Sequence, residues 1–121
     1  MTLLVVSPDY ASHLLPLLQI ARRWLDTRGE VVVATGPATR AGPIATLTYQ
    51  ADARRHDLLY DPDGVLARLG EIVRDVRPER VVVDHVAFGA RLALHAIGVP
   101  AVSVVLGHPS ALPAAAAIAA G

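Results

Sequence analysis

The chain has 121 residues, of which 53% are hydrophobic, and its 11 basic and 11 acidic side chains give a formal net charge of zero. This length and apolar content predict a single folded domain and exclude a disordered chain. The balanced charge argues against a nucleic-acid partner, and an aromatic content of 4% argues against stacking on bases.

The sequence contains no cysteine, so disulfides and thiolate metal sites are excluded. Its five histidines lack the HxH and HxxxH spacings of metal ligands, and we expect no metal. The N-terminus does not resemble a signal peptide, and no run of about 18–20 apolar residues predicts a membrane span. We therefore expect a cytoplasmic protein without a membrane span.

The first elements of the chain are a strand, a loop and a helix. The apolar run Thr2–Val6 predicts a strand that is buried on both faces. A loop over residues 9–12 follows, and apolar residues at helical spacing over 14–25 then predict a helix. Pro16 is expected in the first turn of that helix and Gly29 at its C-terminal end.

The rest of the chain continues the alternation of strands and helices. The predicted elements are a strand at 31–35, a turn or short helix at 36–40, a strand at 44–50, a polar loop at 52–61, a helix at 65–76, a strand at 81–84, a helix at Phe88–Ile97, a strand at 101–106 and a helix at 110–121. Asp63 and Ser110 are the expected N-caps of the helices that follow them. Pro78 and Gly98 end the second and third helices.

Strands that read as continuous apolar runs between helices indicate a parallel sheet covered on both faces. Because crossovers are right-handed, we expect an α/β fold, a Rossmann-like doubly wound sheet of about five strands in the order 3-2-1-4-5. The pattern shows no internal repeat and no linker, so residues 1–121 are expected to form one domain.

This strand order places a candidate site where the carboxyl ends of the first and fourth strands meet, because ligands of open α/β sheets bind at the point of strand reversal. His13 follows the first strand and Asp84 ends the fourth. A carboxylate that accepts the imidazole Nδ1–H leaves the other ring nitrogen free to take a proton from a hydroxyl. In the alternative interpretation, His13 is an ordinary helix-start residue and Asp84 a helix cap.

Other candidate sites are weaker. His85 is expected to pack or hydrogen-bond at a strand end, and His95 to be solvated on a helix. The loop over residues 7–12 has no glycine and one acid, Asp9, so neither a dinucleotide fingerprint nor a Walker loop is present. Arg54 and Arg55 lie in the polar loop and are expected to be solvated.

Two blocks of the sequence resemble a known family. The residues that carry the resemblance are Ser7-Pro8, His13 to Leu18, Ala21 to Leu25, Arg28 to Pro37, Arg77-Pro78, Val81 to Asp84, Ala87 to Arg91 and Gly98 to Ser103. Together they resemble the N-terminal, acceptor-binding domain of GT-B glycosyltransferases, in particular the bacterial macrolide and antibiotic enzymes related to the UDP-glycosyltransferases. The family usually has glycine before the histidine, where this chain has Ser12.

The resemblance implies inverting transfer of a sugar from a nucleotide sugar to an acceptor hydroxyl. In the resemblance, His13 would be the general base and Asp84 its orienting partner. We further expect Tyr10, Ser12, Phe88 and His108 to contact the small-molecule acceptor. The family's C-terminal domain carries most of the nucleotide-sugar site and has no counterpart in this sequence. We therefore expect a truncated domain that has no cofactor and is inactive alone.

Two other functions remain open at this stage. The chain could be a non-catalytic Rossmann-like domain that binds a glycosyltransferase half or forms a homodimer through its apolar tail, residues 111–120. It could also be a flavodoxin-like domain, although the glycine-free first loop argues against that reading.

Overall fold

The computed structural model describes residues 1–27, 29–50 and 61–105. Its elements are β1 (Thr2–Val6), α1 (Ala11–Thr27), β2 (Glu30–Thr35), β3 (Ala45–Thr48), α2 (Pro62–Val76), β4 (Arg80–Asp84), α3 (Phe88–Ile97) and β5 (Val102–Val104). The five strands pair in parallel in the order β3-β2-β1-β4-β5, which confirms the predicted fold and strand order.

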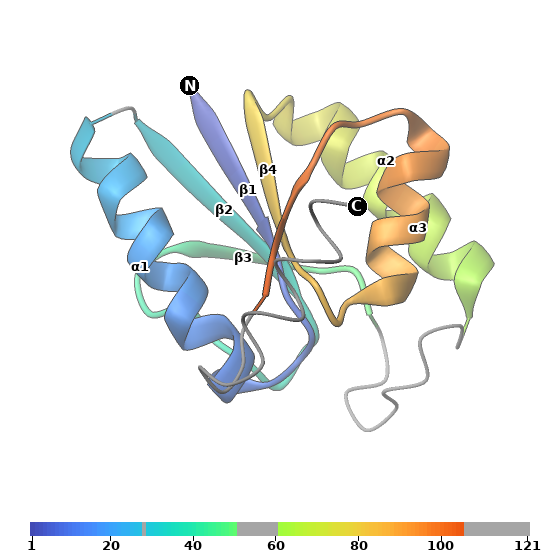
Figure 1. Cartoon of the computed structure of the whole chain (residues 1–121), viewed down its shortest axis with the longest axis horizontal. Coiled ribbons are helices and arrows are strands. Elements are labelled where there is room, and N and C mark those ends of the chain that lie inside the picture. The colour runs from blue at the N-terminus through green and yellow to red at the C-terminus, as the bar shows by residue number, and fades with distance from the viewer. Residues whose placement is uncertain (28, 51–60, 106–121) are drawn as a thin grey trace.

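Helices cover both faces of the sheet (Figure 1). Helix α1 packs on one face, against alternate strand residues such as Leu3, Val5 and Val33. Helices α2 and α3 pack side by side on the other face, where Leu4 and Val83 are buried. Because consecutive strand residues point to opposite faces, one apolar run supplies both cores.

Two helix starts differ from the sequence prediction. Helix α1 begins at Ala11, because the Tyr10 carbonyl accepts the N–H groups of His13 (3.1 Å) and Leu14 (3.0 Å). Pro16 therefore lies in the second turn, not the first. The N-cap of α2 is Asp61, two residues before the expected Asp63, and its side chain accepts the Gly64 N–H at 3.1 Å.

The other boundaries follow from local backbone chemistry. Residues 36–40 form turns and no helix. Arg77 adopts the left-handed conformation (φ 50°) and ends α2 immediately before Pro78, and Gly98 (φ 81°) ends α3 as predicted. The predicted polar loop, apart from Asp61, and the predicted tail helix lie outside the described residues.

Candidate functional site

The candidate site lies between β1 and β4, which are neighbours in the sheet and from which the strand order runs in opposite directions. Val6 at the end of β1 is in register with Val83, so the next residue of β4, Asp84, lies at the carboxyl edge. Asp84 is on the same face as Val82, which packs in the α1-side core. His13, in the first turn of α1, approaches from that face.

The structure brings the His13 ring and the Asp84 carboxylate into contact. Nδ1 of His13 lies 2.6 Å from Oδ2 of Asp84. The Asp84 side chain is fully buried, whereas the His13 side chain is 31% exposed. The second oxygen of Asp84, Oδ1, accepts the backbone N–H of Val86 at 3.1 Å. Both oxygens of the carboxylate thus have a partner, and the His13 side chain is still partly exposed to solvent.

This geometry defines the tautomer that can act as a base. A carboxylate can only accept, so the proton of the short contact belongs to Nδ1, and Nε2 of neutral His13 is the acceptor. Because Asp84 is buried, it can stabilise positive charge that develops on the ring. The pair can therefore take a proton from a hydroxyl placed at Nε2 of His13.

Two of the residues predicted to contact the acceptor substrate lie beside His13 in the structure. The Tyr10 ring centroid is 6.0 Å from that of His13, with the rings tilted by 53°. Ser12 is exposed in the first turn of α1. His108 lies outside the described residues.

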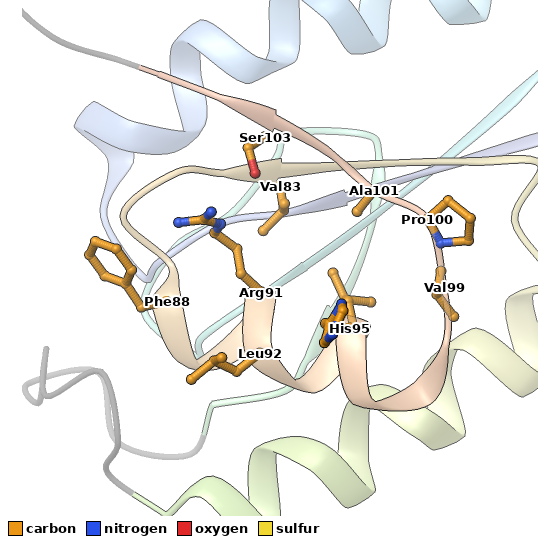
Figure 2. A pocket seen from close by; sticks show the side chains of 10 residues that line it. Val83, Phe88, Arg91, Leu92, His95, Val99, Pro100, Ala101 and Ser103 are labelled. Carbon is orange, nitrogen blue, oxygen red and sulfur yellow. The ribbon is translucent and has the colours of Figure 1, made fainter. Parts of the chain in front are cut away.

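Phe88 is placed differently from the other predicted site residues. It lines a pocket of about 460 Å³ between α3 and β5, on the sheet face that carries Val83 (Figure 2). The pocket is lined by Val83, Phe88, Arg91, Leu92, Leu94, His95, Val99, Pro100, Ala101 and Ser103, a set that includes neither member of the His13–Asp84 pair. His95 is exposed, as predicted for a helix-surface residue.

His85 and Arg91 complete the surroundings of Phe88. The rings of His85 and Phe88 meet edge to face at 5.9 Å, which agrees with the expectation that His85 packs at a strand end. The Arg91 guanidinium lies 5.5 Å from the Phe88 centroid and donates to the His85 carbonyl at 3.1 Å. Arg91 was not predicted as a site residue, although its place in the first turn of the third helix puts it near this strand end.

A second set of side chains supports the loop that precedes His13. Tyr49 is buried, and its hydroxyl donates to the Ser7 carbonyl at 3.1 Å. Burial raises the pKa of the Tyr49 phenol above its usual value, and the negative charges of Asp84 and Asp9 raise it further. The sequence contained a signal for this residue, because Tyr49 lies near the carboxyl end of the strand predicted at 44–50 and the carboxyl ends of parallel strands share one edge.

Within the described ranges, no group of three or more His, Cys, Asp and Glu side chains could hold a metal ion. In the same part of the chain, no helix has the length and apolar content needed to cross a bilayer.

The fold and the pair define a Rossmann-like α/β domain with a His–Asp contact at the switch point. Solved structures with a similar fold include glycosyltransferases. SnogD from Streptomyces nogalater matches with a TM-score of 0.75 and 21% identity, over 88% of this chain and 33% of its own. The spinosyn rhamnosyltransferase SpnG, complexed with thymidine diphosphate, matches with a TM-score of 0.74 and 20% identity, over 92% of this chain and 36% of its own. The glycosyltransferase VinC, in complex with dTDP, matches with a TM-score of 0.72 and 18% identity, over 90% of this chain and 35% of its own.

The chain therefore has the fold of bacterial antibiotic-type glycosyltransferases and spans about a third of their length. No family model and no curated protein sequence matches it.

Proposed function

We propose that this chain is the acceptor-side part of a GT-B glycosyltransferase that transfers a sugar from a nucleotide sugar to an acceptor hydroxyl. The 2.6 Å contact between His13 Nδ1 and Asp84 Oδ2 at the switch point carries the proposal. The fold likeness to solved glycosyltransferases supports it.

In the proposed reaction, Nε2 of His13 accepts the proton of the acceptor hydroxyl. The acceptor oxygen attacks the anomeric carbon of the donor while the bond from that carbon to the nucleotide diphosphate breaks. Attack from the face opposite the leaving group inverts the configuration. Asp84 stabilises the imidazolium and keeps its own charge. Tyr10 and Ser12 are the proposed acceptor contacts beside His13, with Phe88 and His108 as further candidates.

The nucleotide diphosphate needs hydrogen-bond donors or cations as its charge develops. The loop between β1 and α1 does not offer them, because it lacks glycine and its carboxylate, Asp9, faces the neighbouring turn. That carboxylate accepts the N–H groups of Ala38 (3.0 Å) and Thr39 (2.8 Å), so these two donors already have a partner. We propose that a C-terminal glycosyltransferase half supplies the donor site, and that residues 1–121 alone transfer no sugar.

The test is reconstitution with a candidate C-terminal half, followed by a nucleotide-sugar turnover assay. His13→Ala should lower kcat by about 10²–10⁴, the usual contribution of a general base. Asp84→Asn should lower kcat as well, because the pair loses its carboxylate. Gln19→Ala, on the exposed side of the same helix, is the matched control and should leave turnover unchanged. Turnover that survives His13→Ala would refute the base.

The chain alone provides a second test. Isothermal titration with nucleotide sugars should show no saturable binding, and mass spectrometry should detect no product. Turnover by the chain alone that is lost in His13→Ala would refute the need for a second half and keep the pair.

A different observation favours a second candidate function, that of a non-catalytic, self-associating domain. Large apolar side chains are exposed along α3 and β5, with Leu92 57% and Val102 61% exposed. Exposed apolar patches mark interaction surfaces. A homodimer detected by light scattering, without turnover in any reconstituted mixture, would support this function over the enzyme.

A further inference from the structure

The buried polar side chains of the described residues are concentrated at one place in the fold. They are Ser7, Asp9, Thr35, Thr39 and Asp84, to which the buried Tyr49 adds a hydroxyl. All of them lie at or just beyond the carboxyl ends of β1, β2, β3 and β4. No buried side-chain nitrogen or oxygen in the described ranges lacks a hydrogen-bond partner. Burying polar groups is costly, so a satisfied polar network at one edge points to a requirement for precise geometry there.

Two hydroxyls from outside the loop hold its backbone. The Tyr49 hydroxyl, beyond the end of β3, donates to the Ser7 carbonyl at 3.1 Å. The Thr35 hydroxyl, at the end of β2, donates to the Pro8 carbonyl at 3.0 Å. Both carbonyls thus point inward onto fixed donors, and the loop is anchored at two consecutive residues.

The same loop determines where the base-carrying helix begins. The Pro8 carbonyl also accepts the N–H of Tyr10 at 2.8 Å. The Tyr10 carbonyl in turn accepts the N–H of His13 at 3.1 Å and opens helix α1. A short chain of hydrogen bonds therefore links the Thr35 hydroxyl to the backbone that carries the His13 ring. The Tyr49 hydroxyl holds the carbonyl of Ser7, the residue covalently before Pro8.

Asp9 holds the loop between β1 and α1 at a third point, through hydrogen bonds to the turn after β2. Its two carboxylate oxygens accept the N–H groups of Ala38 and Thr39 in the turn after β2. A Cβ atom at Gly36 would lie 2.4 Å from the Asp9 carboxyl carbon, so the absence of a side chain at Gly36 allows this contact.

We propose that Tyr49 and Thr35 are positioning residues for the His13–Asp84 pair, which act by fixing the backbone that aims the imidazole at the carboxylate. Their importance for turnover rests on the proposed function, whereas their effect on the pair does not. Small displacements of reacting groups are expensive: about 1 Å can cost on the order of 10²-fold in rate. Burial and the neighbouring carboxylates raise the pKa of Tyr49 above its usual value, so its hydroxyl remains a donor into the alkaline range.

The experiment removes each hydroxyl while keeping the shape of the side chain, in Tyr49→Phe, Thr35→Val and the double variant. Thr27→Val is the matched control, because the Thr27 hydroxyl donates to the Arg23 carbonyl at the far end of α1 (2.8 Å). Thr35→Ser restores a hydroxyl at the tested position. The amide spectrum of each protein reports whether the sheet is intact.

The first readout is the His13 Nδ1–H resonance in ¹⁵N-labelled protein, assigned through its loss in His13→Ala. We expect a low-field proton that exchanges slowly with water in the parent chain, Thr27→Val and Thr35→Ser. In the double variant, exchange should be at least about tenfold faster, with intermediate effects in the single variants. An unchanged Nδ1–H resonance in a folded double variant would overturn the proposal. Exchange in Thr35→Ser as fast as in Thr35→Val would also overturn it, because Thr35→Ser keeps the hydroxyl.

The second readout is kinetic and separates the two proposals. In a reconstituted transferase, Tyr49→Phe should lower kcat by about tenfold and leave KM for the acceptor within about twofold. Faster Nδ1–H exchange without turnover in any mixture would support positioning and refute the glycosyltransferase function. Normal kcat and an unchanged resonance in the double variant would refute positioning and leave the function standing.

Discussion

Two regions on either side of Asp84 have opposite character. The site edge, formed by residues 7–13, 35–39, 49 and 84, contains buried polar side chains, and each of their buried nitrogen and oxygen atoms has a hydrogen-bond partner. The α3–β5 surface, formed by Phe88, Leu92, Val102 and Val105, is apolar and yet exposed by between 37% and 61%. Every acidic residue of the chain lies at or before Asp84, and only Arg91 among residues 85–121 belongs to the strongly charged types.

The two regions have different free-energy costs: one buries polar groups, and the other exposes apolar groups to water. Single exposed apolar residues are ordinary, whereas buried polar groups and clustered exposed apolar groups are informative. At the site edge, burying polar side chains is costly, but their hydrogen bonds fix the geometry of the loop. The α3–β5 surface leaves apolar area in contact with water, which fits a surface that another molecule covers. Substitutions should therefore be severe at the first region and mild in the isolated chain at the second.

The largest effect on stability is expected from Asp9→Ala. This change removes the acceptor of two backbone N–H groups, one of them in a buried hydrogen bond, and should lower the free energy of unfolding by about 3 kcal/mol. Urea unfolding measures the difference. Asp75→Ala, at an exposed site on α2, is the control and should stay within about 0.5 kcal/mol of the parent. Equal midpoints for the two variants would contradict the contrast.

A pair of glycines sharpens the comparison. Gly36→Ala places a methyl group 2.4 Å from the Asp9 carboxyl carbon and should destabilise by about 2 kcal/mol. The nearest contact of a methyl group at Gly70, in α2, is Ile97 Cδ1 at 3.9 Å. Gly70→Ala should therefore stabilise by about 0.5–1 kcal/mol, because alanine is the better helix former. Thermal melts of both variants test the signs, and two equal shifts would be inconsistent with a tight site edge.

Alkaline pH tests Tyr49 in particular. Its pKa is raised in the folded chain, so the unfolded state releases this proton first, near pH 10. The contribution of Tyr49 is complete below about pH 10 and falls by about 1.4 kcal/mol per pH unit above it, until the folded pKa is reached. Tyr49→Phe should remove this slope. Identical pH dependences of urea midpoints between pH 9 and 11 would show that the phenol is not protected by burial.

The smallest effect on the isolated chain is expected on the α3–β5 surface. Leu92 is 57% exposed, so Leu92→Lys should change the free energy of unfolding by no more than about 0.5 kcal/mol. The same change should weaken any self-association, because a charge interrupts the apolar surface. Sedimentation velocity over a range of concentrations measures this. A loss of stability above about 2 kcal/mol would mean that Leu92 belongs to the core.

The sequence by itself determined the strands, their order and the meeting of His13 with Asp84. Continuous apolar runs indicated strands buried on both faces, and the doubly wound pattern with right-handed crossovers favoured the order that the structure has. Because the carboxyl ends of neighbouring parallel strands share an edge, a residue after β1 and a residue ending β4 had to be close. These predictions follow from the periodicity of apolar residues along the sequence and from general rules on how strands connect.

Only the tertiary structure decided which polar groups hold the loop between β1 and α1, and on which face of the sheet Phe88 lies. Tyr49 meets Ser7 across 42 positions of sequence, Thr35 meets Pro8 across 27, and Asp9 meets Thr39 across 30. Periodicity reports the face on which a residue lies, but not which hydroxyl reaches which carbonyl once strands are in register. The starts of α1 and α2 were not predicted for a related reason. Each depends on hydrogen bonds accepted by a single residue, Tyr10 or Asp61, and helical spacing does not encode them.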